Sequence, residues 1–106
     1  MTTSAGTETT ADRVAAAVLA HPAVARLHGG SFGTIASYLP GRRITGVRAG
    51  EPGEGVEVGV VLRLDRPMPE VVQQLRRSIA EIAGPGPVDI TIGDVVTAEE
   101  APEDGG

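Results

Sequence analysis

The stretch from Gly55 to Val96 constrains the fold more than any other part of this chain, because its hydrophobic period changes twice. Apolar residues alternate along Val56–Leu64, follow a helical stripe over Pro69–Ala83, and alternate again along Val88–Ile92. A period of two that changes to 3.6 and back is typical of a strand, a helix and a second strand. We therefore predict a βαβ unit, with two parallel strands joined by a right-handed crossover.

The two faces of the first of these strands differ, which decides how the sheet is covered. One face is entirely apolar and is predicted to pack on the core: Val56, Val58, Val60, Leu62 and Leu64. The other is mixed and is predicted to be at least partly solvated: Glu57, Gly59, Val61, Arg63 and Asp65. This asymmetry fits a mixed or antiparallel sheet with helices on one side only. The helix is predicted to face that sheet with four residues: Val72, Leu75, Ile79 and Ile82.

The N-terminal part of the chain predicts a helix and a short strand. Thr9 or Thr10 is a suitable N-cap, and an Ala-rich stretch with a narrow apolar stripe continues the helix to about Ala20. Pro22 ends this helix, because the residue before a proline avoids the α region. A short strand is then predicted at Val24–Leu27.

A glycine loop at residues 29–33 precedes the stretch that is hardest to assign. Pro40-Gly41 suits the two central positions of a type II turn, which favours a hairpin of Thr34–Leu39 with Arg42–Arg48. A short helix over Gly33–Leu39 is the alternative, because the apolar residues there also fit helical spacing.

These elements predict one α/β (α+β) domain over residues 10–96, with a small mixed sheet and two helices on one face. The predicted order is α-β-β-β-β-α-β, and the βαβ unit is C-terminal. Residues 1–9 are rich in Ser, Thr and Gly, and residues 97–106 are acidic, so both are predicted to be disordered tails.

The composition excludes several classes of protein. The chain has no cysteine, which excludes disulfides and thiolate metal sites. No apolar run in the sequence, Val58–Leu62 included, is long enough to cross a bilayer, so no direct membrane insertion is expected. Met1–Thr10 lacks the basic and apolar regions of a signal peptide, which makes the cytoplasm the expected location.

The net charge of −5 at pH 7 conceals an uneven distribution. All nine basic residues are arginines, and the acid-free segment Arg13–Gly50 holds five of them: Arg13, Arg26, Arg42, Arg43 and Arg48. Adjacent Arg42 and Arg43 are predicted to point to opposite faces of a strand. They form either a solvated turn or a contact for an anion or an acidic partner.

No catalytic constellation stands out in the sequence. His21 and His28 have no carboxylate or cysteine nearby, so structural or neutral roles are expected for both. The two histidines and the scattered acids also lack metal-ligand spacing. We therefore expect a non-enzymatic protein without a cofactor.

The glycine loop contains a G-x-x-G arrangement like the one in KH domains, which bind single-stranded RNA. Because no Lys or Arg lies inside this loop, a tight structural turn is the favoured interpretation, with Phe32 as a core plug. A small KH-like nucleic-acid-binding module is the alternative function, and it would use four arginines: Arg26, Arg42, Arg43 and Arg48.

A series of blocks between Ala11 and Val96 carries a family resemblance through its order and spacing. The blocks are Val24–Gly30, Phe32-Gly33, Tyr38–Ile44 with Gly46-Val47, Gly55–Val58 and Pro67–Val71. In these blocks the chain resembles the alkaline-shock-protein family of envelope stress response proteins, in its short single-domain form.

The resemblance implies a non-enzymatic scaffold domain that acts in the cytoplasm through protein–protein contacts. It also implies a membrane-anchored protein partner, which would hold the chain at the periphery of the membrane, and self-association into a homo-oligomer. The family brings no catalytic residues. We expect interaction residues where Gly29–Val47 meets the solvated strand face: Phe32, Tyr38, Arg42, Arg43, Arg48, Val61 and Arg63.

Overall fold

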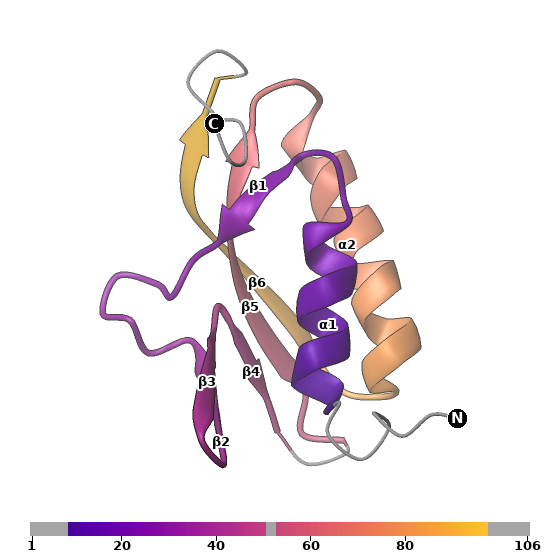
Figure 1. Ribbon diagram of the computed structural model, residues 1–106. Helices are drawn as coiled ribbons and strands as arrows, with labels where there is room; N and C mark the ends of the chain where they lie inside the picture. The colour runs from indigo at the N-terminus through magenta and orange to yellow at the C-terminus, as the bar shows by residue number, and fades with distance from the viewer. Residues whose placement is uncertain (1–8, 51–52, 98–106) are drawn as a thin grey trace.

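The computed structural model describes residues 9–50 and 53–97. Two helices cover one face of a four-stranded mixed sheet, and a two-stranded hairpin stands beside that sheet (Figure 1). The predicted fold class and the order of elements are confirmed, with one refinement. The strand predicted at Arg42–Arg48 is divided into β3 (Arg42–Thr45) and β4 (Val47–Ala49). Both predicted tails, apart from Thr9 and Thr97, lie outside the described residues.

The strand β5 (Val56–Arg63) is the centre of the larger sheet. On one side it pairs in parallel with β6 (Val88–Val96), which confirms the parallel pairing expected of the βαβ unit. On its other side β5 pairs antiparallel with two short strands, which lie end to end. β4 lies beside the first half of β5, and β1 (Val24–Leu27) lies beside the second half.

The two helices begin and end close to the predicted residues. α1 (Thr10–Leu19) has Thr9 as its N-cap in a capping box, in which the Asp12 amide donates to the Thr9 hydroxyl at 3.2 Å. The carboxylate of Asp12 accepts from the Thr9 amide at 2.8 Å. α2 (Met68–Ala83) has a proline in its first turn and ends at Gly84, whose φ of 81° favours glycine.

The hydrophobic core lies between the two helices and the helix-covered face of the sheet. Four of the five β5 residues predicted to face the core are buried there: Val56, Val58, Val60 and Leu62. Leu64 is 55% exposed, because β5 ends at Arg63 and this side chain lies beyond the covered part of the strand. The prediction of Leu64 as a core residue is wrong.

The buried stripe of α2 is shifted by one position from the prediction at its start. Leu75 and Ile79 are buried as expected, but Val71 takes the place predicted for Val72, which is only half-buried. Ile82 is also half-buried and packs against the edge of the core. A spacing of four residues, from Val71 through Leu75 to Ile79, defines the line that faces the sheet.

The opposite face of β5 is not solvated at its centre, contrary to the prediction. Val61 is completely buried, and its neighbours across the sheet are Arg26 of β1 and Asp94 of β6. The His28 amide donates to the Gly59 carbonyl oxygen at 2.8 Å, so the chain that leads into the glycine loop lies directly against β5. A Cβ atom at Gly59 would lie 2.0 Å from the His28 carbonyl oxygen, so only glycine permits this approach.

The segment Thr34–Leu39 forms a hairpin strand and not a helix. β2 (Ala36–Leu39) pairs antiparallel with β3, so the favoured prediction of a hairpin is confirmed, although the strand begins two residues later than expected. Gly41 in the connecting turn has a φ of 79°, as a type II turn requires at its second central position.

Within the described residues, no helix is both long enough and apolar enough to cross a membrane.

Candidate interaction surface

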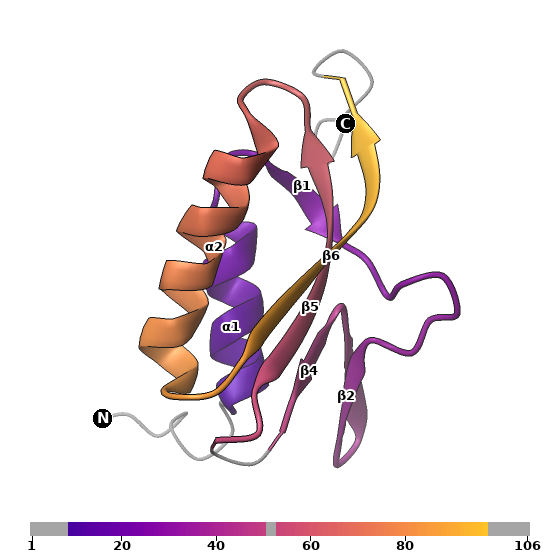
Figure 2. The same ribbon diagram turned by 180° about the vertical axis from the view of Figure 1, so that it is seen from behind.

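The glycine loop holds Phe32 away from the body of the domain. The loop is closed at its base, where the Ile35 amide donates to the Gly29 carbonyl oxygen at 3.0 Å, and at its tip, where the Gly33 amide donates to the Gly30 carbonyl oxygen at 3.1 Å. Phe32 is one of the two central residues of this turn, and its side chain is 89% exposed. The loop extends from the sheet on the side opposite the helices (Figures 1 and 2). The tight turn agrees with the prediction, but Phe32 is not a core plug.

The hairpin has an inner and an outer face, because side chains alternate along its strands. On the outer face, Tyr38 lies opposite Arg43, and the Arg43 guanidinium carbon lies 5.9 Å from the centre of the Tyr38 ring. Tyr38 is 71% exposed. On the inner face, Ile44 packs against the core and Arg42 reaches α1. The prediction that Arg42 and Arg43 point to opposite faces is therefore confirmed.

The outer face of the hairpin continues into the glycine loop. A Cβ atom at Gly29 would lie 3.2 Å from the Cγ2 of Thr45, which is on the same face as Tyr38 and Arg43. The Gly46 amide also donates to the Ile35 carbonyl oxygen at 2.7 Å, which fixes the loop against the end of β3. We call Phe32, Tyr38 and Arg43 together the aromatic–arginine surface. Aromatic side chains and arginine are the residues most enriched where proteins bind one another.

Arg42 forms an ion pair with Asp12 at the surface of the domain. Its two terminal nitrogens donate to the two carboxylate oxygens of Asp12, each at 2.8 Å, so the contact is bidentate. The hydrogen bond from Arg42, followed by the one from the Thr9 amide, holds the pKa of Asp12 well below its ordinary value. The same contact raises the pKa of Arg42. Arg42 thus connects the hairpin to the first turn of α1.

Three other predicted site residues also have structural roles. Arg48 forms an ion pair with Glu57 across β4 and β5. Arg63 donates to the carbonyl oxygens of Pro22 at 3.0 Å and Val24 at 2.9 Å, which fixes the start of β1. Val61 is buried beneath its cross-strand neighbours and is removed as a candidate for contact with a partner.

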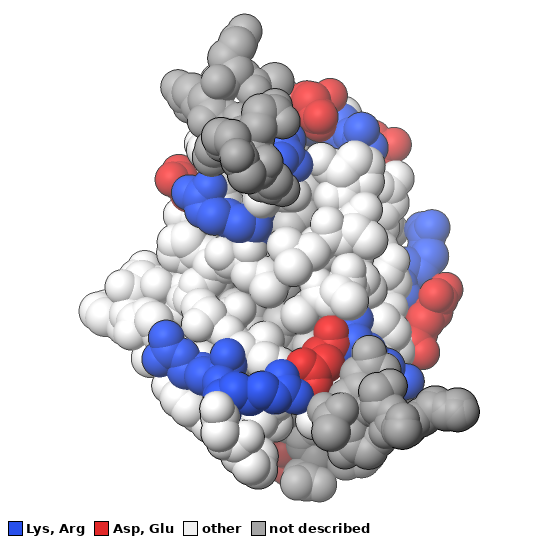
Figure 3. Space-filling model, in the orientation of Figure 1, with Lys and Arg blue, Asp and Glu red and all other residues white. Residues whose placement is uncertain are grey.

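The charged side chains on this side of the molecule are distributed as these contacts suggest. Figure 3 shows a row of arginine side chains over the hairpin, just below the protruding loop, and the row ends against an acidic side chain. A broad uncharged area lies above the row. Of the four arginines proposed for nucleic-acid binding, Arg42 and Arg48 are engaged with carboxylates. This pairing weakens the KH-like alternative, which needs them for phosphates.

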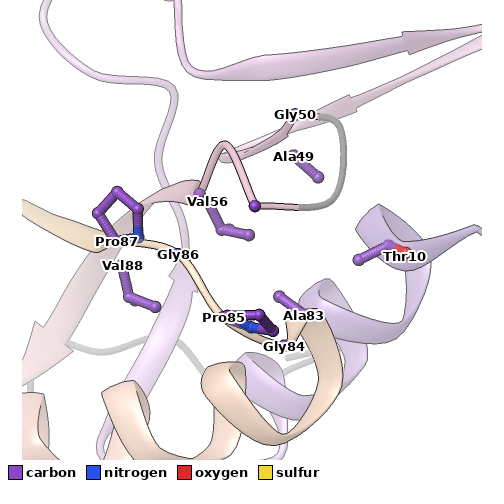
Figure 4. Close-up of a pocket in the computed structure, with 12 residues that line it drawn as sticks. Thr10, Ala49, Gly50, Val56, Ala83, Gly84, Pro85, Gly86, Pro87 and Val88 are labelled. Carbon is purple, nitrogen blue, oxygen red and sulfur yellow. The ribbon is translucent and has the colours of Figure 1, made fainter.

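A small cavity elsewhere lacks the groups that chemistry would require. It lies between the turn that precedes β5 and the loop that follows α2, and its volume is about 60 Å³ (Figure 4). Pockets for small molecules are usually several times larger, from roughly 300 Å³ upward. Among the described residues that line it, only Thr10 has a polar side chain. The cavity therefore gives no reason to place a reaction there.

Asp12 and Gln74 are the contact residues that sequence reasoning missed. Asp12 completes the capping box of α1 and also accepts the ion pair from Arg42. The Oε1 of Gln74 on α2 lies 2.7 Å from Nε2 of His21. Since Nδ1 of His21 accepts from the Ala23 amide at 3.0 Å, His21 connects α2 to the start of β1, the structural role expected of it. The spacing of Thr9 and Asp12 fits a capping box, but nothing local in the sequence pointed to Arg42 or to His21 as a partner.

In comparisons with protein-family models, curated proteins and solved structures, nothing matches this chain. The resemblance to envelope stress response proteins therefore stays a prediction. The function proposed below is based on the aromatic–arginine surface.

Proposed function

We propose that this chain is a non-enzymatic interaction domain, a scaffold that binds a protein partner through the aromatic–arginine surface. The observation that carries the proposal is the 89% exposure of Phe32 at the tip of a closed loop. A chain with one phenylalanine and one tyrosine leaves both of them exposed, on connected elements. Burial of a phenylalanine side chain is worth about 2 kcal/mol, so a partner that covers it gains substantially.

The surface combines features that suit a protein partner better than a nucleic acid. Tyr38 is stacked near Arg43, which orders a flexible cation before binding and lowers the entropy that a partner must remove. The G-x-x-G loop carries Ser31 and Phe32 where a phosphate-binding loop would carry basic residues. The surface offers apolar area with one cation at its side, which fits an apolar patch that contains a carboxylate.

We further propose that the partner is anchored in a membrane and that the chain acts on the cytoplasmic side, as the resemblance to envelope stress response proteins implies. Self-association of the chain through the same surface is the second outcome that the resemblance allows. Both outcomes place Phe32 in a protein–protein contact, so one crosslinking experiment addresses them together.

The test is photo-crosslinking of the full chain in cells, with a photoreactive residue at position 32 and, as a control, at position 81 on the solvent side of α2. Position 32 should yield a specific product with an integral membrane protein, or with a second copy, that position 81 does not yield. Identical product patterns from both positions, or no product at position 32 during envelope stress, would count against the proposal.

A further inference from the structure

The two edges of the four-stranded sheet differ in how they are covered. At the edge formed by β4 and β1, the Ser37 hydroxyl donates to the Val47 carbonyl oxygen at 2.6 Å and accepts from the Ala49 amide at 3.3 Å, so the hairpin covers the β4 part of this edge. At the other edge, β6 pairs with β5 alone, and no strand among the described residues lies beyond it (Figures 1 and 2). An open edge nine residues long is a template for another strand.

The register shows which backbone groups of β6 point away from the sheet. The Val56 amide donates to the Pro87 carbonyl oxygen at 2.9 Å, and the Leu64 amide donates to the Val96 carbonyl oxygen at 2.8 Å, so these carbonyls point toward β5. Because pairing groups alternate along a strand, the amide and carbonyl groups of Val88, Ile90 and Ile92 point outward.

One hydrogen bond agrees with the outward direction of these groups, and it covers only a small part of the edge. Arg76 of α2 donates to the carbonyl oxygen of Val88 from outside the sheet. No hydrogen bond from the described part of the chain reaches the outward amide or carbonyl groups of Ile90 and Ile92. Two consecutive outward positions are therefore available to a pairing strand.

The side chains of β6 give the edge two chemically distinct faces. Asp89 aligns with Glu57 and Asp94 aligns with Val61, two residues on the same face of β5, because Gly93 forms a bulge that restores this alignment. Both aspartates are exposed. On the helix-covered face, Ile92 is 37% exposed, and half-buried Val72 lies one helical turn from Arg76.

A second copy of β6 is a poor occupant for this edge. Antiparallel pairing of two copies about a two-fold axis would place four aspartates on one face of the joined sheet. β6 contains no basic residue that could offset them. Acidic side chains on an open edge thus disfavour self-pairing, but they favour a strand of opposite charge.

We propose that the β6 edge binds an extended segment of a partner protein in which basic and apolar side chains alternate. The backbone of the segment would pair with the outward groups of Ile90 and Ile92, and its basic residues would lie beside Asp89 and Asp94. Its apolar residues would cover Ile92 on the helix side. This is strand addition with charge-based selection, and it uses a different edge from the aromatic–arginine surface, so it goes beyond the function proposed above.

The test uses the full chain and a blocked synthetic peptide of alternating arginine and valine, as long as β6. Binding should shift the backbone amide resonances of Ile90 and Ile92 and slow their hydrogen exchange. The Asp89→Asn/Asp94→Asn variant should bind the peptide about tenfold more weakly. The Glu70→Asn/Glu81→Asn variant makes the same charge change on exposed positions of α2, and it should bind as the wild type does.

Two further probes separate strand addition from simple attraction of opposite charges. The same peptide, N-methylated at the residues that would pair, should lose binding, because it keeps the charge but cannot form the backbone hydrogen bonds. Equal binding of the methylated peptide, or equal weakening by both double variants, would overturn the proposal. So would resonance changes confined to the aromatic–arginine surface, or dimerisation of the free chain through β6 in a native mass measurement.

Discussion

The two faces of β5 are covered in different ways. The covering of one face follows from the hydrophobic periodicity of the sequence, and the covering of the other does not. On one face, α1 and α2 bury a continuous layer of aliphatic side chains. On the other, the chain from His28 to Gly46 approaches the backbone of β5 at Gly59, with hydrogen bonds of 2.8 and 2.9 Å. Side-chain volume controls the first contact, and the absence of a side chain controls the second.

This comparison also locates function. Side chains of the helix-covered layer are used for packing and have little surface left for a partner. The segment on the opposite face is held by backbone contacts and ion pairs, and Phe32 and Tyr38 stay exposed. An aromatic residue that the fold does not require is the stronger indication of binding.

The largest expected effect is at the backbone contact on β5. Gly59→Ala places a methyl group 2.0 Å from the His28 carbonyl oxygen, which no side-chain movement can relieve. We expect this variant to lose about 4 kcal/mol of unfolding free energy, measured by urea denaturation.

Gly33→Ala is the matched control for this substitution. A Cβ atom at Gly33 meets nothing within 4 Å, but its φ of 68° strains a non-glycine residue, so about 1 kcal/mol is expected. If both alanine variants lose the same free energy, the close approach at Gly59 adds nothing to the cost of replacing a glycine, and the contrast between the two faces fails.

A slightly smaller effect is expected on the helix-covered face. Leu75→Ala removes a side chain that is 1% exposed in the centre of the core, and it should cost about 3 kcal/mol in the same denaturation experiment. Leu64→Ala makes the identical chemical change at a position that is 55% exposed, and it should cost less than about 1 kcal/mol. Equal losses would show that the hydrophobic pattern, and not the end of β5, defines the core.

The sequence predicted the helix-covered half well, because each element there repeats a regular period. The α2 caps, the parallel pairing of β5 with β6 and the inward residues of β5 up to Leu62 all follow from local rules. Leu64 was assigned to the core because alternation does not indicate where a covering helix ends. The exposure of Leu64 depends on where the strand leaves the helix-covered layer, which is a tertiary property and not a local one.

The candidate site could be predicted only in part, because exposure depends on what the rest of the chain covers. The hairpin and the opposed directions of Arg42 and Arg43 followed from turn chemistry and strand alternation. The burial of Val61 did not, because it requires Arg26 and Asp94 to lie beside it through two irregular pairings. Phe32 is predicted to be a core plug, because large aromatic residues are usually buried. The closed loop instead keeps its side chain exposed.

A pH-dependent effect on stability should separate Arg42, which is ion-paired with Asp12, from Arg43, which contacts the Tyr38 ring. Because contact with Arg42 lowers the folded-state pKa of Asp12 from 3.8, the ionised carboxylate stabilises the fold above that pH. The stabilisation is lost as the pH falls through the folded-state pKa. Asp12→Asn should therefore unfold more easily than wild type at neutral pH, and the difference should shrink below about pH 4.

Thermal unfolding from pH 7 down to pH 2 measures this difference, with Asp89→Asn as the control at an exposed position of β6. Arg43→Ala should unfold as the wild type does over the whole range, because Arg43 contacts the Tyr38 ring and, among the described residues, no carboxylate. A constant difference between Asp12→Asn and wild type down to pH 2 would show that the ion pair contributes nothing to folding.

The smallest expected effect on stability, and the most direct test of the central claim, comes from Phe32→Ser/Tyr38→Ser. The claim is that this surface binds a partner and does not hold the fold together. The variant should unfold within about 0.5 kcal/mol of the wild type, because both side chains are exposed. In the same preparation it should lose the crosslinked partner, when the photoreactive residue is placed at the adjacent position 31. A variant that keeps the crosslink, or one that loses the partner only because it unfolds, would contradict the claim.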